Sequence, residues 1–418
     1  MIRKRFGDAL LVLLLALGIF LWQRTVFPLW MSDLVLNQVG AYYFRTGDYE
    51  WMYTTASGLE TWHAHSFPIA QRLGNDGDLL PFLYPPFVAA LLSPFAQAPA
   101  IHWRNTLFVV NVLLVFLFAF LIVRLCQVGL SLRAFLWALA LVLLCYPMAR
   151  ATKLGQLVPL LAALTWAGLL LMRSGKTWLS SILLGLVGAA KLFPLALIAL
   201  PLFNRRFKMA VVWLTTAILV YVVSMLTIGL QLHLYWWEAI REFTSLVYPF
   251  FGNQSLLGWL GRVAFGLNPF QEIPMAIPAF GLLRMILIII FGGISFAALW
   301  RIRGHLTGGQ LAISGGLVLS TIRLLLPNAW EHYWLFVLPS LGWAIYETVR
   351  HRDARFWEIL LSIASFFFLM KLTHFYFFDT LFSRIMSGSQ TIGMLLLWVW
   401  LLRRAWRMER TLDALQTA

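Results

Sequence analysis

The chain alternates long apolar stretches with short polar connections along almost its whole length. A helix needs about 17 to 25 mostly apolar residues to cross the hydrocarbon core of a membrane, and lipid admits only structures whose backbone polar groups bond internally. The pattern therefore predicts an all-α integral membrane protein with about twelve transmembrane helices. Windows of that length lie near residues 8–28, 84–99, 105–125, 134–150, 156–172, 178–203, 208–230, 278–300, 308–326, 333–350, 356–376 and 389–404.

Two places within these spans are irregular. The segments on either side of Gly155-Gln156 are short enough to form a re-entrant pair. Pro194 is expected to break the sixth span, because proline removes a helical hydrogen bond. The topology between residues 100 and 205 therefore stays open at this stage.

Two long stretches, 29–83 and 231–277, separate the spans. The first carries six of the 17 acidic residues, and its segment 34–44 has an apolar helical face that suits a helix lying in the membrane interface. The second is rich in Trp, Tyr and Phe, and Trp and Tyr favour the headgroup zone. We expect both loops to cover the mouth of a cavity. Since no repeat or linker is visible, residues 1–418 are treated as one membrane domain.

The composition excludes a soluble protein, because 61% of the residues are hydrophobic and only 12% are charged. The net charge of +15 comes from short basic clusters at 3–5, 204–208, 301–305, 350–355 and 403–410. Cytoplasmic loops are enriched in Lys and Arg, so these clusters and both termini are predicted to be cytoplasmic. The two long loops are then extracytoplasmic, and no nucleic-acid partner is expected.

This orientation has one conflict with the charge rule, because it places Arg124, Arg133, Arg173 and Lys176 on the extracytoplasmic side. The first apolar segment resembles a signal peptide, but it lacks a small-residue cleavage site before Pro28 and is expected to be a retained span. The two cysteines have no metal-ligand spacing, so we expect neither a disulfide nor a metal site from them.

Asp33 is the first candidate for chemistry, because it follows the first span directly. It has two interpretations. Ser32 can cap a helix, with the carboxylate stabilised by the helix dipole. Alternatively, Asp33 is a general base at the membrane surface. Sugar transfer from a lipid phosphate needs one such base and no partner acid, since phosphate leaves without protonation.

The companion groups for a phosphate are cations, and several lie within apolar sequence. Lys191 is the strongest candidate, because a charge deep inside a span is costly and marks a functional site by default. The alternative, that its side chain extends to the membrane interface, is disfavoured by its mid-span position with Pro194 just beyond. Arg262 and Arg323 lie on the same predicted side as Asp33 and are either phosphate ligands or interfacial anchors. Lys153 is a weaker candidate.

Other polar groups are candidates for binding a substrate. Glu331 and His332 lie at a predicted helix N-terminus, which attracts anions. His332 either orients a phosphate or the acceptor there, or caps the helix. Gln156, Asn253 and Gln254 offer neutral groups of the kind that bind sugar hydroxyls. Residues 253–255 also match an N-glycosylation sequon, which we interpret as coincidental. The chain lacks the motifs of P-loop NTPases, zinc proteases and serine hydrolases.

Taken together, these pieces resemble the polyprenol-phosphate-dependent glycosyltransferases of family 87, in the GT-C superfamily, from Asp33 to about Tyr346. In two respects the chain departs from the family: Tyr333 replaces a second histidine, and apolar residues follow Asp33. The likeness rests on Asp33, Tyr84-Pro85-Pro86, Gly155-Gln156, Lys191 with Pro194, Asn253-Gln254-Ser255, and Trp330-Glu331-His332.

The resemblance implies a GT-C-type helical bundle in the plasma (inner) membrane, with its active site facing the periplasm or cell exterior. It implies that Asp33 is the general base and that a polyprenyl-phosphate sugar, expected to be mannose, is the donor. The acceptor would be a lipid-linked or cell-envelope glycan, and no metal or other cofactor is implied. Tyr84 joins the candidate substrate-binding residues through this resemblance.

The main alternative is a transporter or flippase of a lipid-linked sugar, which would share the membrane class and the buried cation. Transporters often show repeated halves around a midplane site, and no repeat is visible in this chain. A structural protein of envelope synthesis is a second alternative, but it leaves the buried charges without a purpose. Arabinosyl and glucosyl donors remain open.

Overall fold

The computed structural model describes residues 2–29, 31–55, 57–75, 79–271, 274–304, 307–350, 356–370 and 380–417. Parts of the predicted first loop and basic clusters, including Asp76, Asp78, His305 and residues 351–355, lie outside these ranges. Within them the chain is helical, with two isolated β-bridges and no longer strand. The predicted all-α class is therefore confirmed.

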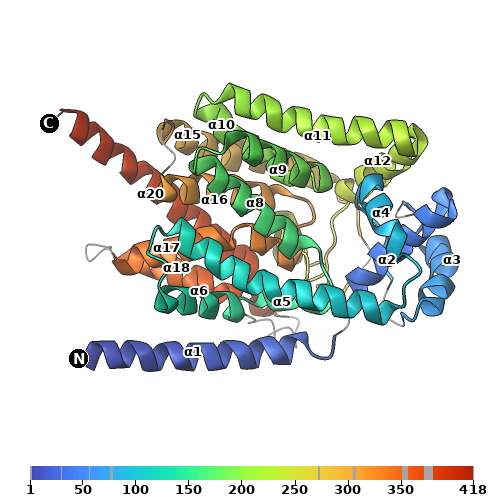
Figure 1. The fold of residues 1–418 in the computed structure, drawn as a ribbon, viewed down its shortest axis with the longest axis horizontal. Coiled ribbons are helices and arrows are strands. Elements are labelled where there is room, and N and C mark those ends of the chain that lie inside the picture. Colours follow the sequence, from blue (N-terminus) through green and yellow to red (C-terminus); the bar gives the residue numbers. More distant parts are fainter. Residues whose placement is uncertain are drawn as a thin grey trace.

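The helices follow one another in the order shown in Figure 1, where their labels are given. They are α1 (Ile2–Val26), α2 (Ser32–Thr46), η1 (Tyr49–Trp51), α3 (Leu59–Arg72), α4 (Pro86–Leu92), η2 (Ser93–Phe95), α5 (Ala100–Leu125), α6 (Leu132–Leu144), α7 (Tyr146–Leu154), α8 (Val158–Arg173), α9 (Thr177–Ala190), η3 (Phe193–Ile198), α10 (Ala199–Phe203), α11 (Phe207–Ile228), α12 (Leu230–Ser245), α13 (Leu256–Ala264), α14 (Pro278–Leu287), η4 (Ile288–Gly292), α15 (Gly293–Arg301), α16 (Gly308–Leu325), η5 (Glu331–Phe336), α17 (Leu338–Arg350), α18 (Phe356–Leu369), α19 (Leu381–Met386) and α20 (Ser389–Thr417).

Five helical segments of the described chain are long and apolar enough to cross a membrane: Arg5–Val26, Ala100–Leu125, Phe207–Ile228, Pro278–Arg301 and Gly308–Leu325. The pair α6 and α7 makes a sixth if it counts as one span bent by 62°. Several of the other predicted spans are shorter helices of 10 to 17 residues. The multi-pass class therefore holds, whereas the predicted number of about twelve spans is not confirmed.

The predicted span at residues 84–99 is wrong. This segment forms the short helices α4 and η2, which together cover only Pro86–Phe95. It packs on α2, where the side-chain amide of Gln38 donates to the carbonyl oxygens of Ala96 (3.2 Å) and Ala98 (2.7 Å). The segment is too short to cross a membrane and belongs to the first loop. Val88 and Ala89 are buried, whereas Leu91 and Phe95 are 70% and 62% exposed.

This correction removes the conflict with the charge rule. Arg133 forms an ion pair with Asp8 near the start of α1 (3.2 Å), and Arg173 donates to the carbonyl oxygen of Arg124 (3.1 Å). These arginines thus lie at the end of the molecule that carries both chain termini, opposite α2 and α3 (Figure 1). We call this the basic end, and the end with α2, α3, α4 and α12 the loop end.

The packing separates a lipid-facing layer from a protein core. Only 17% of the apolar window is buried in α1, in α11 and in α14–α15, against 83% in the central helix α16. Leu226 on α11, for example, is 81% exposed. In the core, the indole of Trp166 on α8 donates to the carbonyl oxygen of Phe336 (2.7 Å). Such a belt of exposed apolar side chains needs lipid around it.

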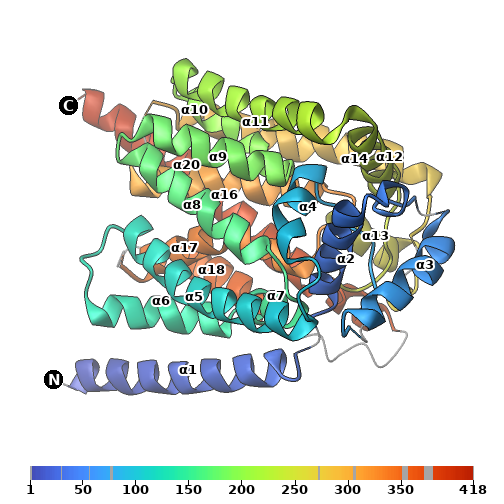
Figure 2. The same cartoon turned by 45° about the vertical axis from the view of Figure 1, so that its right-hand side comes forward.

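The expected break in the sixth span is present. Helix α9 ends at Ala190, Lys191 has extended backbone angles (φ −147°, ψ 115°), and the chain continues as η3, which contains Pro194. In Figures 1 and 2, α9 runs from the basic end toward α4 and stops there. The break therefore places a cation on unwound backbone close to the loop end.

Candidate active site

The candidate site begins at the N-terminus of α2. Met31 is the N-cap residue, in a left-handed conformation (φ 56°), and its N–H donates to the carbonyl oxygen of Lys153 (2.8 Å). Ser32 is the first helical residue rather than the cap, and its hydroxyl donates to Oδ1 of Asp33 (3.3 Å). Asp33, 6% exposed, thus lies in the first turn, where the helix dipole favours a carboxylate.

Gly155 lets the turn between α7 and α8 approach this helix end. Its φ is +71°, and a Cβ atom at this position would lie 2.8 Å from Cβ of Leu34 and 2.9 Å from Sδ of Met31. A larger residue would therefore be strained in its backbone and would push α2 away. Because Gly155 brings this turn close to α2, the side chain of the following residue, Gln156, can reach Asp33.

Gln156 donates a hydrogen bond from its side-chain amide to Oδ2 of Asp33. Burial raises the pKa of Asp33, while the bond from Gln156 and the charges of Arg150 and Lys191 partly offset that increase. A carboxylate with this balance is a stronger base than an exposed aspartate and still has groups that favour its ionised form. Among the described residues, Oδ1 accepts only the long hydrogen bond from Ser32 and is the freer oxygen.

Lys191 faces two aromatic rings. Its Nζ lies 4.3 Å from the ring centroid of Tyr333 and 5.3 Å from that of Tyr84. It has no carboxylate within ion-pair distance among the described residues, although its charge acts on Asp33. The Tyr84 hydroxyl beside it is buried without a hydrogen-bond partner in the described part of the chain. The structure therefore brings Asp33, Tyr84, Gln156 and Lys191 together.

Arg150 is a member of this cluster that the sequence did not single out. It lies on α7, one helix turn before the Gly155 turn, and its Nε is 3.5 Å from Oε2 of the buried Glu331 on η5. Its position at the end of a predicted span resembled an ordinary interfacial arginine. In the structure α7 is bent by 62° from α6, and the charge of Arg150 acts on Asp33.

His332 and Arg323 complete the cluster. His332 is 4% exposed, and its pKa is well below the usual range because of burial and the charges of Lys191, Arg150 and Arg323. It is therefore neutral at pH 7. Arg323, near the end of α16, stacks over Trp334 (5.3 Å) and donates from Nη1 to the carbonyl oxygen of Gln254 (3.3 Å). Its Nε and Nη2 are buried without hydrogen-bond partners in the described chain.

The cluster has an excess of positive charge. Its ionic groups are three cations, Arg150, Lys191 and Arg323, and two carboxylates, Asp33 and Glu331. One positive charge is thus not balanced within the described residues, in a buried place where it is costly. An anionic ligand such as a phosphate would neutralise it.

A second group of polar side chains, around α13, forms its hydrogen bonds with the chain itself. Asn253 donates to the carbonyl oxygens of Tyr248 (2.9 Å) and Pro327 (3.2 Å), and Gln254 donates to that of Ser387 (2.8 Å). All three residues of the sequon are fully buried. A glycan could not reach Asn253 in this conformation.

Arg262 belongs to the same group and is also fully buried. It donates to the hydroxyl of Ser387 (2.6 Å) and to the carbonyl oxygens of Pro249 (3.1 Å), Phe250 (3.2 Å) and Asn253 (3.0 Å). Of the predicted substrate-binding residues, Asn253, Gln254 and Arg262 thus bond to the chain itself, and Arg323 links them to the Asp33 cluster.

The chain was compared with known proteins. The model of glycosyltransferase family 87 matches residues 82–327, more than half of the 418 residues. The chain belongs to glycosyltransferase family 87. No solved structure matches it significantly.

Two kinds of curated mycobacterial proteins are similar to this family 87 chain. A polyprenol-phosphate-mannose-dependent alpha-(1-2)-phosphatidylinositol pentamannoside mannosyltransferase of Mycolicibacterium smegmatis is 28% identical over 278 residues, which are 64% of this chain and 62% of the relative. An alpha-(1->3)-arabinofuranosyltransferase of Mycobacterium tuberculosis is 26% identical over 275 residues, 62% of this chain and 58% of the relative. The chain therefore matches less than two thirds of the length of either relative.

The family match covers only part of the cluster. It contains Tyr84, Arg150, Gln156, Lys191 and Arg323. Asp33, Glu331 and His332 lie outside residues 82–327, so their place in the site rests on the geometry of the structure.

Proposed function

We propose that this glycosyltransferase moves a hexose, mannose, from a polyprenyl-phosphate donor to a lipid-linked or cell-envelope glycan acceptor. The observation that carries this proposal is the buried Asp33 carboxylate, held by Gln156 beside two cations at the loop end. The mannosyltransferase among the relatives supports the donor. The arabinofuranosyltransferase makes an arabinosyl donor the alternative to be tested.

In this mechanism Asp33 accepts the proton of the acceptor hydroxyl on Oδ1, because Oδ2 is already bonded to Gln156. The hydroxyl oxygen attacks the anomeric carbon of the donor, and the bond from that carbon to the phosphate oxygen breaks. The polyprenyl phosphate leaves as an anion. A single displacement inverts the configuration at the anomeric carbon.

Lys191 and Arg150 bind the leaving phosphate. The excess positive charge of the cluster supports this role, since a cation that attracts the phosphate stabilises the charge that develops as the bond breaks. The Tyr84 hydroxyl, which has no partner in the described chain, donates to the phosphate or the sugar. His332 is neutral and contributes a hydrogen bond rather than a charge.

The active site faces the periplasm or cell exterior of a plasma (inner) membrane. The support is the position of Arg124, Arg133 and Arg173 at the basic end, which the positive-inside rule assigns to the cytoplasm. Asp33 is at the opposite, loop end. A donor in the outer leaflet could then reach it without crossing the membrane.

The test uses purified full-length protein in lipid vesicles, with radiolabelled polyprenyl-phosphate mannose and a membrane lipid extract as acceptor. We expect wild type to move label into a new glycolipid and Asp33→Asn to move none. The matched control is Asp48→Asn, which alters a solvent-exposed carboxylate of the same loop. Within the described residues this carboxylate accepts one hydrogen bond, from Thr46 (2.7 Å).

Two other outcomes would change the proposal. Transfer from the arabinosyl donor alone would replace mannose with arabinose and keep the mechanism. If wild type transfers neither sugar but moves either donor across the bilayer, the protein is a flippase and the proposal fails.

A further inference from the structure

The basic end contains a cavity of about 460 Å³ that the proposed reaction does not use. It lies where the end of α5, the end of α8 and the start of α16 meet, far from Asp33 along these helices. The lining residues are Arg124, Gln127, Val128, Gly129, Arg173 and Thr307. This lining contains two cations and no carboxylate.

Neither arginine of the cavity is neutralised within the described chain. Arg124 is exposed and forms no ion pair or side-chain hydrogen bond there. Arg173 is half-buried and donates from Nη2 to the carbonyl oxygen of Arg124, while its Nη1 is buried without a hydrogen-bond partner. Two guanidinium groups that repel each other and lack an acid favour a bound anion.

The N-terminus of the 18-residue helix α16 adds to the positive potential. Thr307 caps it and lines the cavity. A Cβ atom on Gly308 would lie 2.7 Å from Nη1 of Arg173 and 2.6 Å from Nε2 of Gln127. The glycine therefore lets the guanidinium come directly over the helix start, where backbone N–H groups and the dipole already favour an anion.

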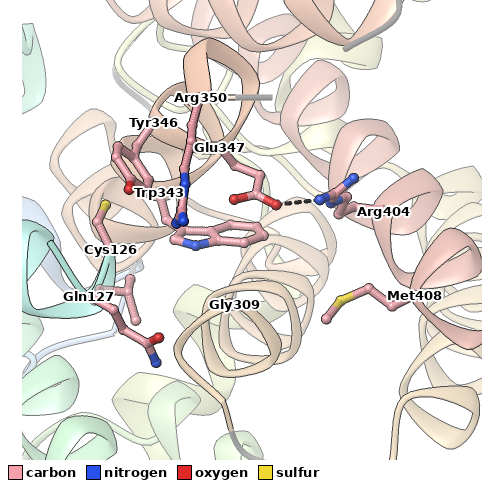
Figure 3. Close-up of a pocket in the computed structure, with 10 residues that line it drawn as sticks. Cys126, Gln127, Gly309, Trp343, Tyr346, Glu347, Arg350, Arg404 and Met408 are labelled. Atoms are coloured by element: carbon pink, nitrogen blue, oxygen red, sulfur yellow. Dashed lines mark hydrogen bonds and ion pairs between the residues drawn. The ribbon is translucent and has the colours of Figure 1, made fainter. Parts of the chain in front are cut away.

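A neighbouring cavity of about 130 Å³ shares Gln127 but differs in its charges. There the carboxylate of Glu347 accepts a hydrogen bond from Arg404, as Figure 3 shows. This acid compensates only one of the two arginines that line that cavity, Arg404 and Arg350. The cavity of Arg124 and Arg173 has no acid in its lining and is therefore the more positive of the two.

The surroundings of the cavity are apolar and face lipid. Leu130 and Leu132, just after Gly129, are 60% and 73% exposed, and Trp178, at the start of α9, is 69% exposed. Exposed leucines and a tryptophan beside arginines are typical of the membrane interface, where acyl chains meet headgroups. These surroundings therefore suit an anion that carries acyl chains, that is, the headgroup phosphate of a lipid.

We propose that this cavity binds the phosphate of an anionic phospholipid from the membrane leaflet at the basic end. Arg124 and Arg173 hold the phosphate, the N-terminus of α16 donates to it, and Leu130 and Leu132 contact the acyl chains. The proposal is independent of the sugar-transfer site, because no residue of the Asp33 cluster lines this cavity.

The test titrates full-length protein in detergent with phosphatidylglycerol or phosphatidylcholine and counts bound lipids by native mass spectrometry. We expect wild type to bind phosphatidylglycerol preferentially, and Arg124→Gln/Arg173→Gln to bind it about tenfold more weakly, as the loss of charge-assisted hydrogen bonds predicts. Arg133→Gln is the matched control, because it removes a nearby charge that Asp8 already pairs.

Three results would overturn the proposal: no preference for phosphatidylglycerol, an equal loss in Arg133→Gln, or displacement of the lipid by inorganic phosphate at low concentration, which would make it a site for a free anion. Should the double variant not fold, Arg124→Gln alone decides the question. Its side chain is exposed, and its loss leaves the packing intact.

Discussion

Two polar groups of this protein look alike in the sequence and differ in how many hydrogen bonds their side chains form within the chain. Arg262 is fully buried, and its guanidinium donates to Ser387 and to three carbonyl oxygens of its own loop. Arg150 and Lys191, near Asp33, have fewer partners. Nε of Arg150 forms no hydrogen bond in the described chain, and Lys191 faces the rings of Tyr84 and Tyr333 and has a side-chain hydrogen bond with Tyr333. Arg262 and Gln254 are fully buried, whereas Arg150, Gln156 and Lys191 are half-buried and have fewer hydrogen bonds.

The glutamines show the same difference. Gln254 donates to the carbonyl oxygens of Phe251 (2.6 Å) and Ser387 (2.8 Å) and accepts from the N–H of Thr391 (3.2 Å). The one hydrogen bond of the Gln156 side chain in the described chain is to Asp33. A polar group that the chain has satisfied stabilises the fold, and one left incomplete is available for a ligand. The comparison predicts a loss of stability from one group and of activity from the other.

The largest effect is expected from Asp33→Asn. Removing the base should lower the transfer rate about 10²- to 10⁴-fold. Burial raises the pKa of Asp33 above its unfolded value, so its contribution to stability declines as pH rises through the folded pKa. The neutral variant should therefore melt no lower than wild type at pH 7. Normal turnover, or a clear drop in melting temperature, would make Asp33 a structural residue.

Arg262→Met should instead lower the stability of the protein and leave its transfer activity unchanged. It leaves Ser387 and three carbonyl oxygens without their donor, which should cost about 3 kcal/mol of stability. Thermal unfolding in detergent measures this change, and transfer per folded molecule should stay at the wild-type level. If Arg262→Met is stable but inactive, Arg262 belongs to the substrate-binding site.

Lys191→Met should weaken donor binding by about 10- to 100-fold, the effect of losing a charge-assisted hydrogen bond to a phosphate. The melting temperature should change little, because the apolar side chain keeps the contacts with Tyr84 and Tyr333. Lys208→Met, at an exposed position on α11, is the control. Unchanged donor affinity in Lys191→Met would remove this residue from the phosphate site.

Gln156→Leu should give the smallest effect, a shift in the pH profile. Transfer needs ionised Asp33, so the rate falls as pH falls through the pKa of that carboxyl. The hydrogen bond from Gln156 lowers this pKa, and its loss should move the acidic limb of the profile to higher pH. Gln71→Leu, on the exposed surface of α3, should leave the profile unchanged. An unmoved limb in Gln156→Leu would separate Gln156 from the base.

Much of the architecture could be predicted from hydropathy. The membrane class, the all-α fold and the break in the sixth span follow from local composition and from Pro194. The span at 84–99 could not be judged in this way, because a short apolar helix that packs partly on α2 has the same composition as part of a membrane-spanning helix. Counting this segment as a span also placed Arg124 and Arg173 on the side opposite the chain termini, whereas the structure places them at the same end as the termini.

The sequence by itself marked Asp33, Gln156 and Lys191 as candidates, since each stands out from its local context. Only the tertiary structure decided that α2, α7, α9, α16 and η5 bring them together with Arg150 and Glu331, and that Arg262 and Gln254 bond to the chain itself. The physical reason is that hydropathy is a property of neighbouring residues, whereas the partners that satisfy a buried polar group come from segments far apart in the chain.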